Sequence, residues 1–230
     1  MNVCLIGDGL ISLTLAKALI NNKIKVFMYC KNNKKTSSHN RTIGITPNNL
    51  DFFQKEIIKI KKNHFWEISK IEIYDEQSKK EKILNFEEPK KILFSIIKND
   101  YLFNKLNKEL NKNNNFKKII IKDKSFYKKI INNKKHNLII NCDGNNEISK
   151  KYFYQKILKN YESIAYVTTV KHNKTKNKKA IQVFTKHGPI AFLPISETQT
   201  SIVYSIKNKS INNNSSLSQA EFEKLIFNNN

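Results

Sequence analysis

Arginine is almost absent from this sequence, and several features of common protein classes are missing too. Of the 42 basic residues in the 230-residue chain only Arg41 is an arginine, and the rest are lysines. No apolar run reaches the ~18–20 residues that a helix needs to span a bilayer. The N-terminus lacks the charged, apolar and small-residue regions of a secretory signal peptide. We therefore expect neither secretion nor a transmembrane helix.

The sequence also lacks the patterns of disulfide and metal frameworks. The three cysteines, Cys4, Cys30 and Cys142, are odd in number, form no CxxC pair and lie in or beside apolar, strand-like segments. We interpret them as buried thiols. The five histidines have neither the HxxxH nor the HExxH spacing of a metal site. We interpret them as surface residues and expect no metal.

The lysine excess gives a formal net charge of +23, which is typical of nucleic-acid-binding proteins. Asparagine and isoleucine are abundant too, and all three residue types have A/T-rich codons, so a mutational bias explains the pattern. The lysines are spread along the chain and seldom alternate with aromatic residues as on an RNA-binding face. We expect no nucleic-acid partner. Because basic surfaces are attracted to anionic lipid, we expect a cytoplasmic protein in peripheral contact with the inner membrane face.

The first 30 residues have the pattern of a βαβ unit. Residues 2–6 predict a buried strand, residues 10–21 a helix and residues 24–29 a second strand, which together have the usual length of such a unit.

The turn between that strand and helix holds a GxGxxG motif that ends in serine, formed by Gly7, Asp8, Gly9, Leu10, Ile11 and Ser12. Gly7 permits the tight turn, and Gly9 lets the backbone approach a pyrophosphate at the positive end of the helix. The motif follows a strand and opens a helix, which is the context it requires. We therefore predict a dinucleotide site; the other interpretation is a plain strand–turn–helix.

The residue that usually contacts the adenosine ribose is acidic and should end the second strand, near position 30. Cys30 stands there, Tyr29 precedes it, and no carboxylate is nearby. The sequence therefore predicts weakened cofactor binding.

The rest of the chain changes character near its middle. Thr46 and Pro47 open a helix, and further elements are expected as strands at 68–74, 83–86 and 92–97, a helix at 100–111, and strands at 118–121 and 137–142. Four more strands without an intervening helix predict an antiparallel sheet, at 163–170, 180–185, 189–194 and 201–206. Ser218 and Glu221 form a capping-box pattern that predicts a final helix.

Three further segments carry residues suited to a site. At Arg41 and Thr42 a chain of lysines uses arginine, whose rigid fork makes bidentate contacts, so we interpret it as a phosphate or flavin contact rather than a chance surface arginine. Asp143 and Gly144 end a strand, where an acid–glycine pair can present a carboxylate to a ligand, although alone it signals only a turn. Residues 184–194, with two prolines and a glycine, predict an edge strand with fixed turns.

In order and spacing these segments resemble the FAD-dependent aromatic hydroxylases typified by para-hydroxybenzoate hydroxylase, and within them the ubiquinone-biosynthesis branch. That branch carries a glycine motif, R-T-x-x-x-[ST], N-x-x-L, A-D-G-A-N-S and F-T-x-x-G-P-x-A-x-L-P. The corresponding residues here are 7–12, 41–46, 99–102, 142–147 and 184–194. The last segment is the most specific to the branch, and the resemblance covers the whole chain.

The resemblance implies an α/β fold with a discontinuous, Rossmann-like FAD-binding domain and an antiparallel β-sheet substrate domain. The implied bounds are 1–75 and 99–150 for the first, 76–98 and 151–217 for the second, and 218–230 for a truncated helix. It implies FAD, NAD(P)H as reductant, and hydroxylation of a prenylated aromatic ring in ubiquinone biosynthesis. The glycine motif, Arg41, Thr42, Asp143 and Gly144 would bind the cofactor. Because the flavin carries the chemistry in this family, no side chain is named as catalytic.

The sequence departs from the family at Asp100, Glu147 and Lys150, and it lacks the later G-D-A-A-H-type segment that holds the ribityl phosphate. We therefore expect an incomplete enzyme, or one that a partner chain completes. Three alternatives stay open: an inactive remnant, another FAD- or NAD(P)-dependent oxidoreductase that shares only the βαβ unit, and a basic binding module.

Overall fold

The computed structural model describes residues 1–31, 41–76, 82–121, 126–132, 135–153, 155 and 157–207. The chain divides into two compact units, one formed by Met1–Ser69 with Glu88–Leu158 and the other by Lys70–Glu87 with Lys159–Asn230. Compared with the implied division, residues 70–75 join the second unit, and residues 88–98 and 151–158 join the first. Strand pairing explains the shifts of 70–75 and 88–98.

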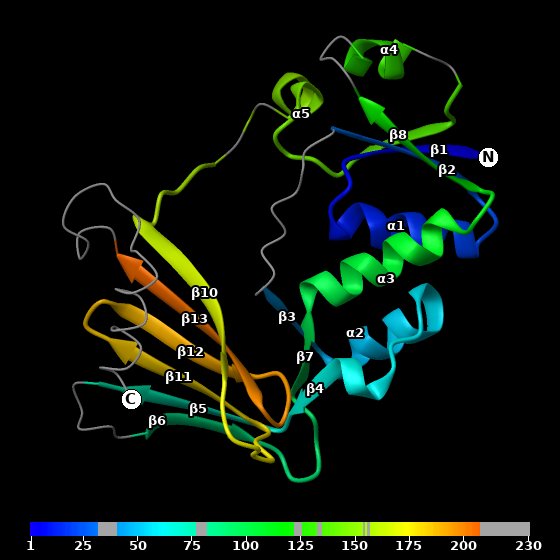
Figure 1. Ribbon diagram of the computed structural model, residues 1–230. Coiled ribbons are helices and arrows are strands. Elements are labelled where there is room, and N and C mark those ends of the chain that lie inside the picture. The colour runs from blue at the N-terminus through cyan, green and yellow to red at the C-terminus, as the bar shows by residue number, and fades with distance from the viewer. Residues whose placement is uncertain are drawn as a thin grey trace. The chain divides into compact units, whose positions relative to one another are not determined.

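The first unit is built on a four-stranded parallel sheet (Figure 1). Its strands are β1 (Asn2–Ile6), β2 (Lys25–Lys31), β8 (Phe116–Ile121) and β9 (Leu138–Asn141), in the order β8-β2-β1-β9. All three pairings are parallel. This is the 3-2-1-4 order of a doubly wound fold, in which the chain reverses its direction of winding between the first and fourth strands.

Helices cover both faces of this sheet. Helices α1 (Leu10–Asn21) and α3 (Asn99–Asn111) lie on one face, and α4 (Phe126–Asn132) and α5 (Glu147–Tyr152) on the other (Figure 1). Strand β1 contributes to both cores, because Leu5 belongs to the same buried cluster as Leu106 of α3, while Ile6 belongs to the cluster that includes Tyr127 of α4. Burial of each such aliphatic side chain contributes about 1.5–3 kcal/mol. The predicted strand 2–6 and helix 10–21 are confirmed, whereas α4 and α5 were not predicted.

A second, antiparallel sheet completes this unit. Its strands are β3 (Thr42–Ile45), β4 (Phe65–Ile68) and β7 (Phe94–Lys98), in the order β3-β7-β4. The helix predicted at Pro47 is α2 (Pro47–Phe52), which continues as a π-helical turn at Phe53–Ile57. Thr46 occupies the N-cap position, but its side chain makes no capping hydrogen bond. Because β7 pairs only within this sheet among the described residues, residues 88–98 belong to the first unit.

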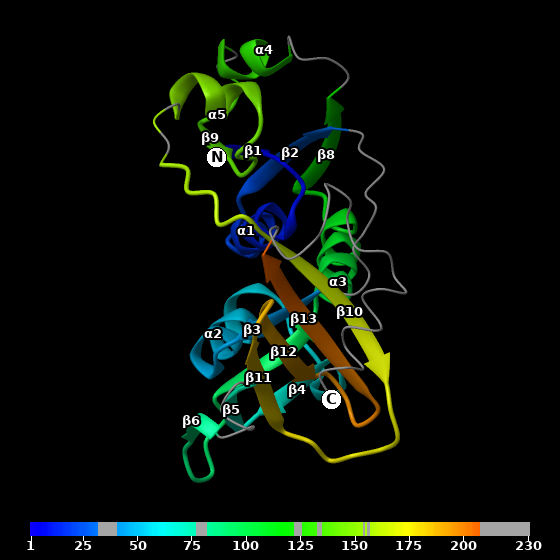
Figure 2. The same ribbon diagram turned by 90° about the vertical axis from the view of Figure 1, so that its left-hand side faces the viewer.

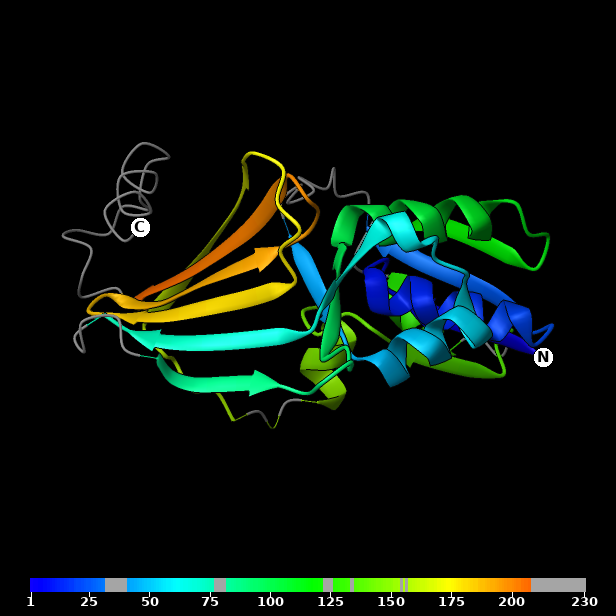
Figure 3. The ribbon, with the colours of Figure 1, turned by 90° about the horizontal axis from the view of Figure 1, so that it is seen from below.

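The second unit is a six-stranded sheet, which Figures 2 and 3 show from two further sides. Its strands run in the order β10-β13-β12-β11-β5-β6, with bounds β5 (Lys70–Asp75), β6 (Lys82–Glu87), β10 (Ser163–Lys171), β11 (Lys179–Thr185), β12 (Gly188–Pro194) and β13 (Gln199–Lys207). The four strands of the second half are antiparallel, as predicted. Strand β5 adds parallel to β11, so the sheet is mixed. No hairpin links these two strands, and nothing local therefore imposes an antiparallel pairing.

One carboxylate is buried in this sheet among lysines. Glu72 is 3% exposed, and its oxygens lie 2.7 Å from Lys179 Nζ and 2.6 Å from Lys82 Nζ. Lys70 Nζ lies at 3.4 Å, and the Tyr74 hydroxyl donates to Glu72 at 2.8 Å. The hydrogen bonds from Lys179 and Lys82 hold the pKa of this carboxyl well below its usual range. A charge buried in this way is stable only while it keeps its partners.

The segment 68–74, expected as one strand, forms two: β4 ends at Ile68 and β5 begins at Lys70. The helix predicted from Ser218 lies outside the described residues. Within the described ranges, no helix has the length and apolar character needed to cross a membrane.

Candidate cofactor-binding site

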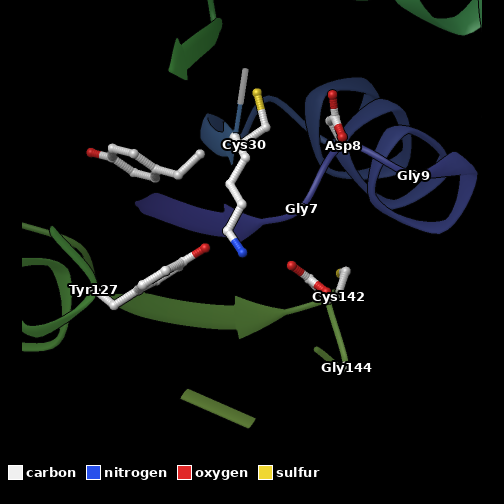
Figure 4. Close-up of a pocket in the computed structure, with 10 residues that line it drawn as sticks. Gly7, Asp8, Gly9, Cys30, Tyr127, Cys142 and Gly144 are labelled. Atoms are coloured by element: carbon white, nitrogen blue, oxygen red, sulfur yellow. The ribbon is translucent and has the colours of Figure 1, made fainter. Parts of the chain in front are cut away.

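A pocket of about 300 Å³ lies in the first unit, beyond the carboxyl ends of the parallel strands. It is lined by Gly7, Asp8 and Gly9 after β1, Tyr29, Cys30 and Lys31 at the end of β2, Cys142, Asp143 and Gly144 after β9, and Tyr127 of α4. Figure 4 shows β1 and β9 ending side by side at Gly7 and Cys142. Because the chain leaves β1 for one face of the sheet and β9 for the other, this is the topological switch point at which such sheets bind ligands.

The glycine turn forms one wall of the pocket. Gly7 has a φ of +106°, a conformation that favours glycine. A Cβ there would lie 3.3 Å from Asp143 Cβ and 3.4 Å from Ser12 Oγ, so the two turns pack closely and a side chain would have to push its neighbours back by a few tenths of an ångström. The N–H of Gly7 also donates to the Tyr29 carbonyl at 2.8 Å. The turn is therefore fixed to the neighbouring strand and to the second turn.

Gly9 differs from Gly7 because it faces open space. It is the N-cap of α1 with an extended backbone, and a Cβ at this position would meet no atom within 4 Å. Leu10 and Ile11 begin the helix, and its first turn carries no acidic side chain. The backbone N–H groups at a helix N-terminus favour an anion there. This wall of the pocket is therefore open to a phosphate.

Ser12, the third position of the motif, has an unsatisfied hydroxyl. The residue is fully buried, and its Oγ has no hydrogen-bond partner within the described residues. An unpaired buried polar group costs about 1–3 kcal/mol. Leu10, Ile11 and Ser12 are not among the residues that line the pocket, so their contact with a cofactor stays a prediction.

The second turn is held by a hydrogen-bonded network. Asn141 Nδ2 donates to Ser149 Oγ at 2.7 Å, and Ser149 Oγ donates to the Asp143 carbonyl at 2.9 Å. The N–H of Asn145 donates to Asp143 Oδ1 at 3.0 Å. Asn146 caps α5 by accepting from the Ser149 N–H at 2.9 Å. The network fixes the turn that carries Asp143 and Gly144 opposite the glycine motif.

Charges of both signs line the pocket. Asp8 pairs with Lys118 of β8, with Nζ and Oδ2 3.2 Å apart. Lys31 is exposed, and its Nζ lies 6.0 Å from the centroid of the buried Tyr127 ring. The Tyr127 hydroxyl points toward the middle of the pocket (Figure 4). Burial, followed by the charges of Asp143 and Glu147, raises the pKa of Tyr127.

The end of β2 lacks the expected acid and presents lysine. Cys30 is 2% exposed, and its Sγ donates to the Ile119 carbonyl at 3.9 Å, so the thiol is held against β8. Cys4 is buried too, which raises its pKa to about 12, whereas Cys142 is only half-buried. Lys31 follows Cys30 directly and lines the pocket. No acidic residue occurs between Asp8 and Asp51 in the sequence.

The predicted contact residues Arg41 and Thr42 lie elsewhere in the unit. Thr42 begins β3, where it pairs with Lys98, and the Arg41 carbonyl accepts from the Asn99 N–H at 3.0 Å. Arg41 is exposed, and neither residue is among those that line the pocket. Their contact with a cofactor stays a prediction.

Some histidines pack more than a surface position would require, which corrects that prediction. The His64 ring stacks on Tyr101 with centroids 3.9 Å apart. His136 is half-buried, its Nε2 lies 3.1 Å from the Tyr29 hydroxyl, and burial lowers its pKa. His39 lies outside the described residues. In the part of the chain that the structure describes, no group of three or more His, Cys, Asp or Glu side chains could hold a metal ion.

The segment 184–194 forms the β11–β12 hairpin of the second unit. Thr185 Oγ1 donates to the Gly188 carbonyl at 2.7 Å and lies 3.0 Å from the Tyr204 hydroxyl. Gly188 has a φ of +138°, and a Cβ there would lie 2.0 Å from the Ser205 carbonyl oxygen. Thr185 and Gly188 of the motif therefore stabilise the turn of the hairpin. The segment was expected on an edge strand, yet both of its strands have neighbours on both sides.

Five lining residues were not predicted as cofactor contacts: Tyr29, Cys30, Lys31, Tyr127 and Cys142. Tyr29 and Cys30 had been noted only where the acid is missing, and Cys142 only as a buried thiol and in the segment 142–147. Lys31 lies two positions after the last residue of the predicted strand 24–29. Its position at the pocket could therefore have been predicted from the sequence once no acidic residue was found there. Tyr127 gave no usable signal, because it belongs to α4 in a lysine-rich stretch where no element was predicted.

A bound dinucleotide fits part of this arrangement. The tightly packed turn at Gly7 and the open position at Gly9 suit the pyrophosphate. The ribose end differs from the usual acidic arrangement, since Cys30 stands where a carboxylate would be expected and the next residue, Lys31, lines the pocket.

Solved structures share this fold at low sequence identity, whereas no protein-family model and no curated protein sequence matches the chain. PqsL, a probable FAD-dependent monooxygenase from Pseudomonas aeruginosa, aligns with a TM-score of 0.69 and 12% identity over 91% of this chain and 61% of that one. HpxO from Klebsiella pneumoniae, solved with FAD, aligns with a TM-score of 0.67 and 10% identity over 99% and 62%. A geranylgeranyl bacteriochlorophyll reductase-like protein from Thermoplasma acidophilum gives 0.66 and 18% over 99% and 61%.

The chain thus spans about six tenths of the length of these structures. At such identities the likeness establishes the fold alone. The chain has the fold of the FAD-dependent monooxygenases.

Proposed function

We propose that this chain forms the cofactor- and substrate-binding part of an FAD-dependent monooxygenase that hydroxylates a prenylated aromatic ring in ubiquinone biosynthesis, with NAD(P)H as reductant. The observation that carries the proposal is the pocket at the switch point, where the glycine turn and the Asp143–Gly144 turn meet. HpxO was solved with FAD and PqsL with the small aromatic compound 2-aminobenzoylacetate, which supports both ligand classes. The order of the five sequence segments supports the ubiquinone branch.

FAD, when bound, would supply the redox and oxygen chemistry. The residues of the chain would bind and orient it. The Gly7–Gly9 turn and the N-terminus of α1 would hold the pyrophosphate, and Asp143 and Gly144 would contact the cofactor from the opposite wall. Arg41 and Thr42 are proposed as further contacts. The six-stranded sheet would bind the ring, since its β11–β12 hairpin carries the segment most specific to the branch.

We also propose peripheral contact with the cytoplasmic face of the inner membrane. A prenylated ring partitions into lipid, and a net charge of +23 attracts the chain to anionic headgroups. A partner chain that completes the site is part of the same proposal.

A second candidate is a flavin-dependent reductase that acts on a prenyl chain. The Thermoplasma acidophilum neighbour, a geranylgeranyl bacteriochlorophyll reductase-like protein, favours it. An inactive remnant is a third candidate, favoured by the missing acid at the end of β2.

The test of the cofactor site is a single substitution, Gly9→Val. The backbone of Gly9 has a φ of −70° and a Cβ there meets nothing within 4 Å, so the variant should fold. The valine side chain would fill the space that a phosphate needs. Loss of the hydrogen bonds from the backbone N–H groups of the turn to the pyrophosphate should weaken FAD binding about 100-fold. FAD fluorescence quenching on titration with the purified chain measures the affinity. Lys17→Ala, on the same helix but outside the pocket lining, is the control and should bind as the unchanged chain does.

Equal FAD affinity in Gly9→Val and the unchanged chain would contradict the site. Activity separates the candidates: a monooxygenase consumes oxygen with NAD(P)H in the presence of a prenylated phenol. A reductase saturates the prenyl double bonds without oxygen, and a remnant does neither.

A further inference from the structure

The ribose end of the pocket has the opposite charge from the one that adenosine cofactors usually meet. A carboxylate at the end of the second strand accepts hydrogen bonds from the ribose 2′-hydroxyl, about 20 residues after the glycine turn. Here β2 ends in Lys31, which lines the pocket, while the Cys30 side chain is held against β8. The sequence has no acidic residue between Asp8 and Asp51 that could take the missing role.

The two carboxylates of the pocket differ in their partners. Asp8 pairs with Lys118 at 3.2 Å, whereas Asp143 keeps its charge and accepts a hydrogen bond from the Asn145 N–H at 3.0 Å within its own turn. Among the described residues no carboxylate pairs with Lys31. Its ammonium lies 6.0 Å from the centroid of the Tyr127 ring, whose face attracts a cation. Lys31 is therefore the basic side chain of the lining that is available to an anionic ligand.

An ammonium and a carboxylate make opposite demands on a ribose. A carboxylate only accepts hydrogen bonds, so it suits hydroxyls and repels a phosphate on the ribose. An ammonium only donates, and a phosphate monoester offers it charged acceptor oxygens. A cation near this position is the feature that accommodates a 2′-phosphate in dinucleotide-binding folds.

We propose that Lys31 determines specificity at the ribose end of this pocket, which prefers an adenosine ligand with a 2′-phosphate over the unphosphorylated adenosine of FAD. The inference rests on the proposed dinucleotide site. It makes Lys31 a binding residue that replaces the usual acid and reverses its preference. It also explains why an FAD site at this turn would be weaker than its glycine motif alone indicates.

The experiment compares four ligands on the full 230-residue chain by isothermal titration calorimetry: 2′,5′-ADP, 3′,5′-ADP, 5′-AMP and FAD. We expect 2′,5′-ADP to bind about 10- to 100-fold more tightly than 5′-AMP, which lacks only the 2′-phosphate, the effect of one charge-assisted hydrogen bond. The isomer 3′,5′-ADP has the same charge, so it measures the attraction of any additional phosphate to a basic protein. It should bind more weakly than 2′,5′-ADP.

Two substitutions of Lys31 and one matched control complete the design. Lys31→Ala should bring 2′,5′-ADP down to the affinity of 5′-AMP. Lys31→Glu should reverse the order and raise the affinity for FAD. Lys25→Glu makes the same charge change at the other end of β2, outside the pocket lining, and should leave the ligand order as it is.

The outcomes separate this inference from the proposed function. FAD binding without a preference for 2′,5′-ADP would overturn the inference and leave the function in place. Equal affinity for the two isomers, or equal effects of Lys31→Glu and Lys25→Glu, would also overturn it. If none of the four ligands binds, both the pocket assignment and the proposed function fail.

Discussion

The parallel sheet of the first unit and the six-stranded sheet of the second are stabilised in different ways. Strand β1 is buried along four consecutive residues and β2 along five, because helices cover both faces of their sheet. In the second unit β6 is exposed throughout, and β5 carries Glu72 into the sheet among three lysines. The first unit therefore depends on apolar packing, which is insensitive to pH. The second has a smaller apolar core around Ile190, Ile202, Tyr204 and Ile206 and depends in addition on a tight hairpin and on a charged cluster.

The largest expected difference in stability between the two units follows from a substitution at Gly188. A Cβ at this position would lie 2.0 Å from the Ser205 carbonyl oxygen, and its φ of +138° disfavours any other residue. Gly188→Ala should destabilise the second unit by about 4 kcal/mol, because backbone of two strands must separate. Urea unfolding followed by far-UV circular dichroism measures the loss. The control is Gly9→Ala in the first unit, where a Cβ meets nothing and stability should hardly change.

Trp66 shows whether the two units respond separately. It is the single tryptophan of the chain and lies in β4 of the first unit, so its fluorescence reports that unit. If Gly188→Ala shifts the tryptophan transition as much as the circular dichroism, the units unfold as one and the comparison fails.

The charged cluster predicts a pH effect confined to the second unit. The pKa of Glu72 is lowered in the folded chain, chiefly by Lys179 and then by Lys82. Since the folded pKa lies below the unfolded one, this stabilisation is complete above the unfolded pKa and is lost as pH falls toward the folded value. At pH values below about 4.5, the unperturbed pKa of a glutamate, we expect the urea concentration at the midpoint of the circular dichroism transition to decrease. The midpoint of the Trp66 fluorescence transition should change less.

Glu72→Gln tests the origin of that pH dependence. The amide leaves Lys82 and Lys179 without a counter-charge, so stability near pH 7 should drop by about 2 kcal/mol. The dependence on acid should flatten at the same time. Glu88→Gln is the matched control, because its partner Lys91 and the carboxylate itself are both exposed and surface pairs contribute little. An unchanged acid response in Glu72→Gln would remove the cluster from the explanation.

Local patterns predicted those parts of the fold and site that depend on local geometry. The strand–glycine–helix start was readable because its apolar period and its two glycines lie within one short segment. The four strands from Ser163 onward were readable for the same reason. The parallel pairing of β5 with β11 was not, because it joins residues more than a hundred positions apart and no local turn records it.

In the site too, residues whose role follows from their own segment were predicted, whereas those whose role depends on packing between distant segments were not. The Gly7–Gly9 and Asp143–Gly144 turns were predicted from their own residues, and the structure brings both to one pocket. Tyr127 was missed, since its role depends on where a short helix in a lysine-rich segment packs. Arg41 stood out by its residue type, yet residue type alone did not place it at the pocket.

The smallest expected effect concerns Ser12 in the first unit, where one substitution should raise the stability of the chain and weaken its binding of FAD. Its buried hydroxyl has no hydrogen-bond partner in the described part of the chain, so the apolar core there contains one unsatisfied polar group. Ser12→Ala removes that group while nearly keeping the volume, and the chain should become more stable by about 1 kcal/mol. If the hydroxyl donates a hydrogen bond to the pyrophosphate, directly or through a water, the same variant should bind FAD several-fold more weakly.

The two measurements for Ser12→Ala are the urea midpoint of Trp66 fluorescence and the FAD titration. Ser95→Ala in β7, also a buried serine of the first unit but far from the glycine motif in sequence, serves as the control and should not alter FAD affinity. A Ser12→Ala chain that is less stable and binds FAD as before would show that the hydroxyl belongs to the packing of the turn and has no part in the site.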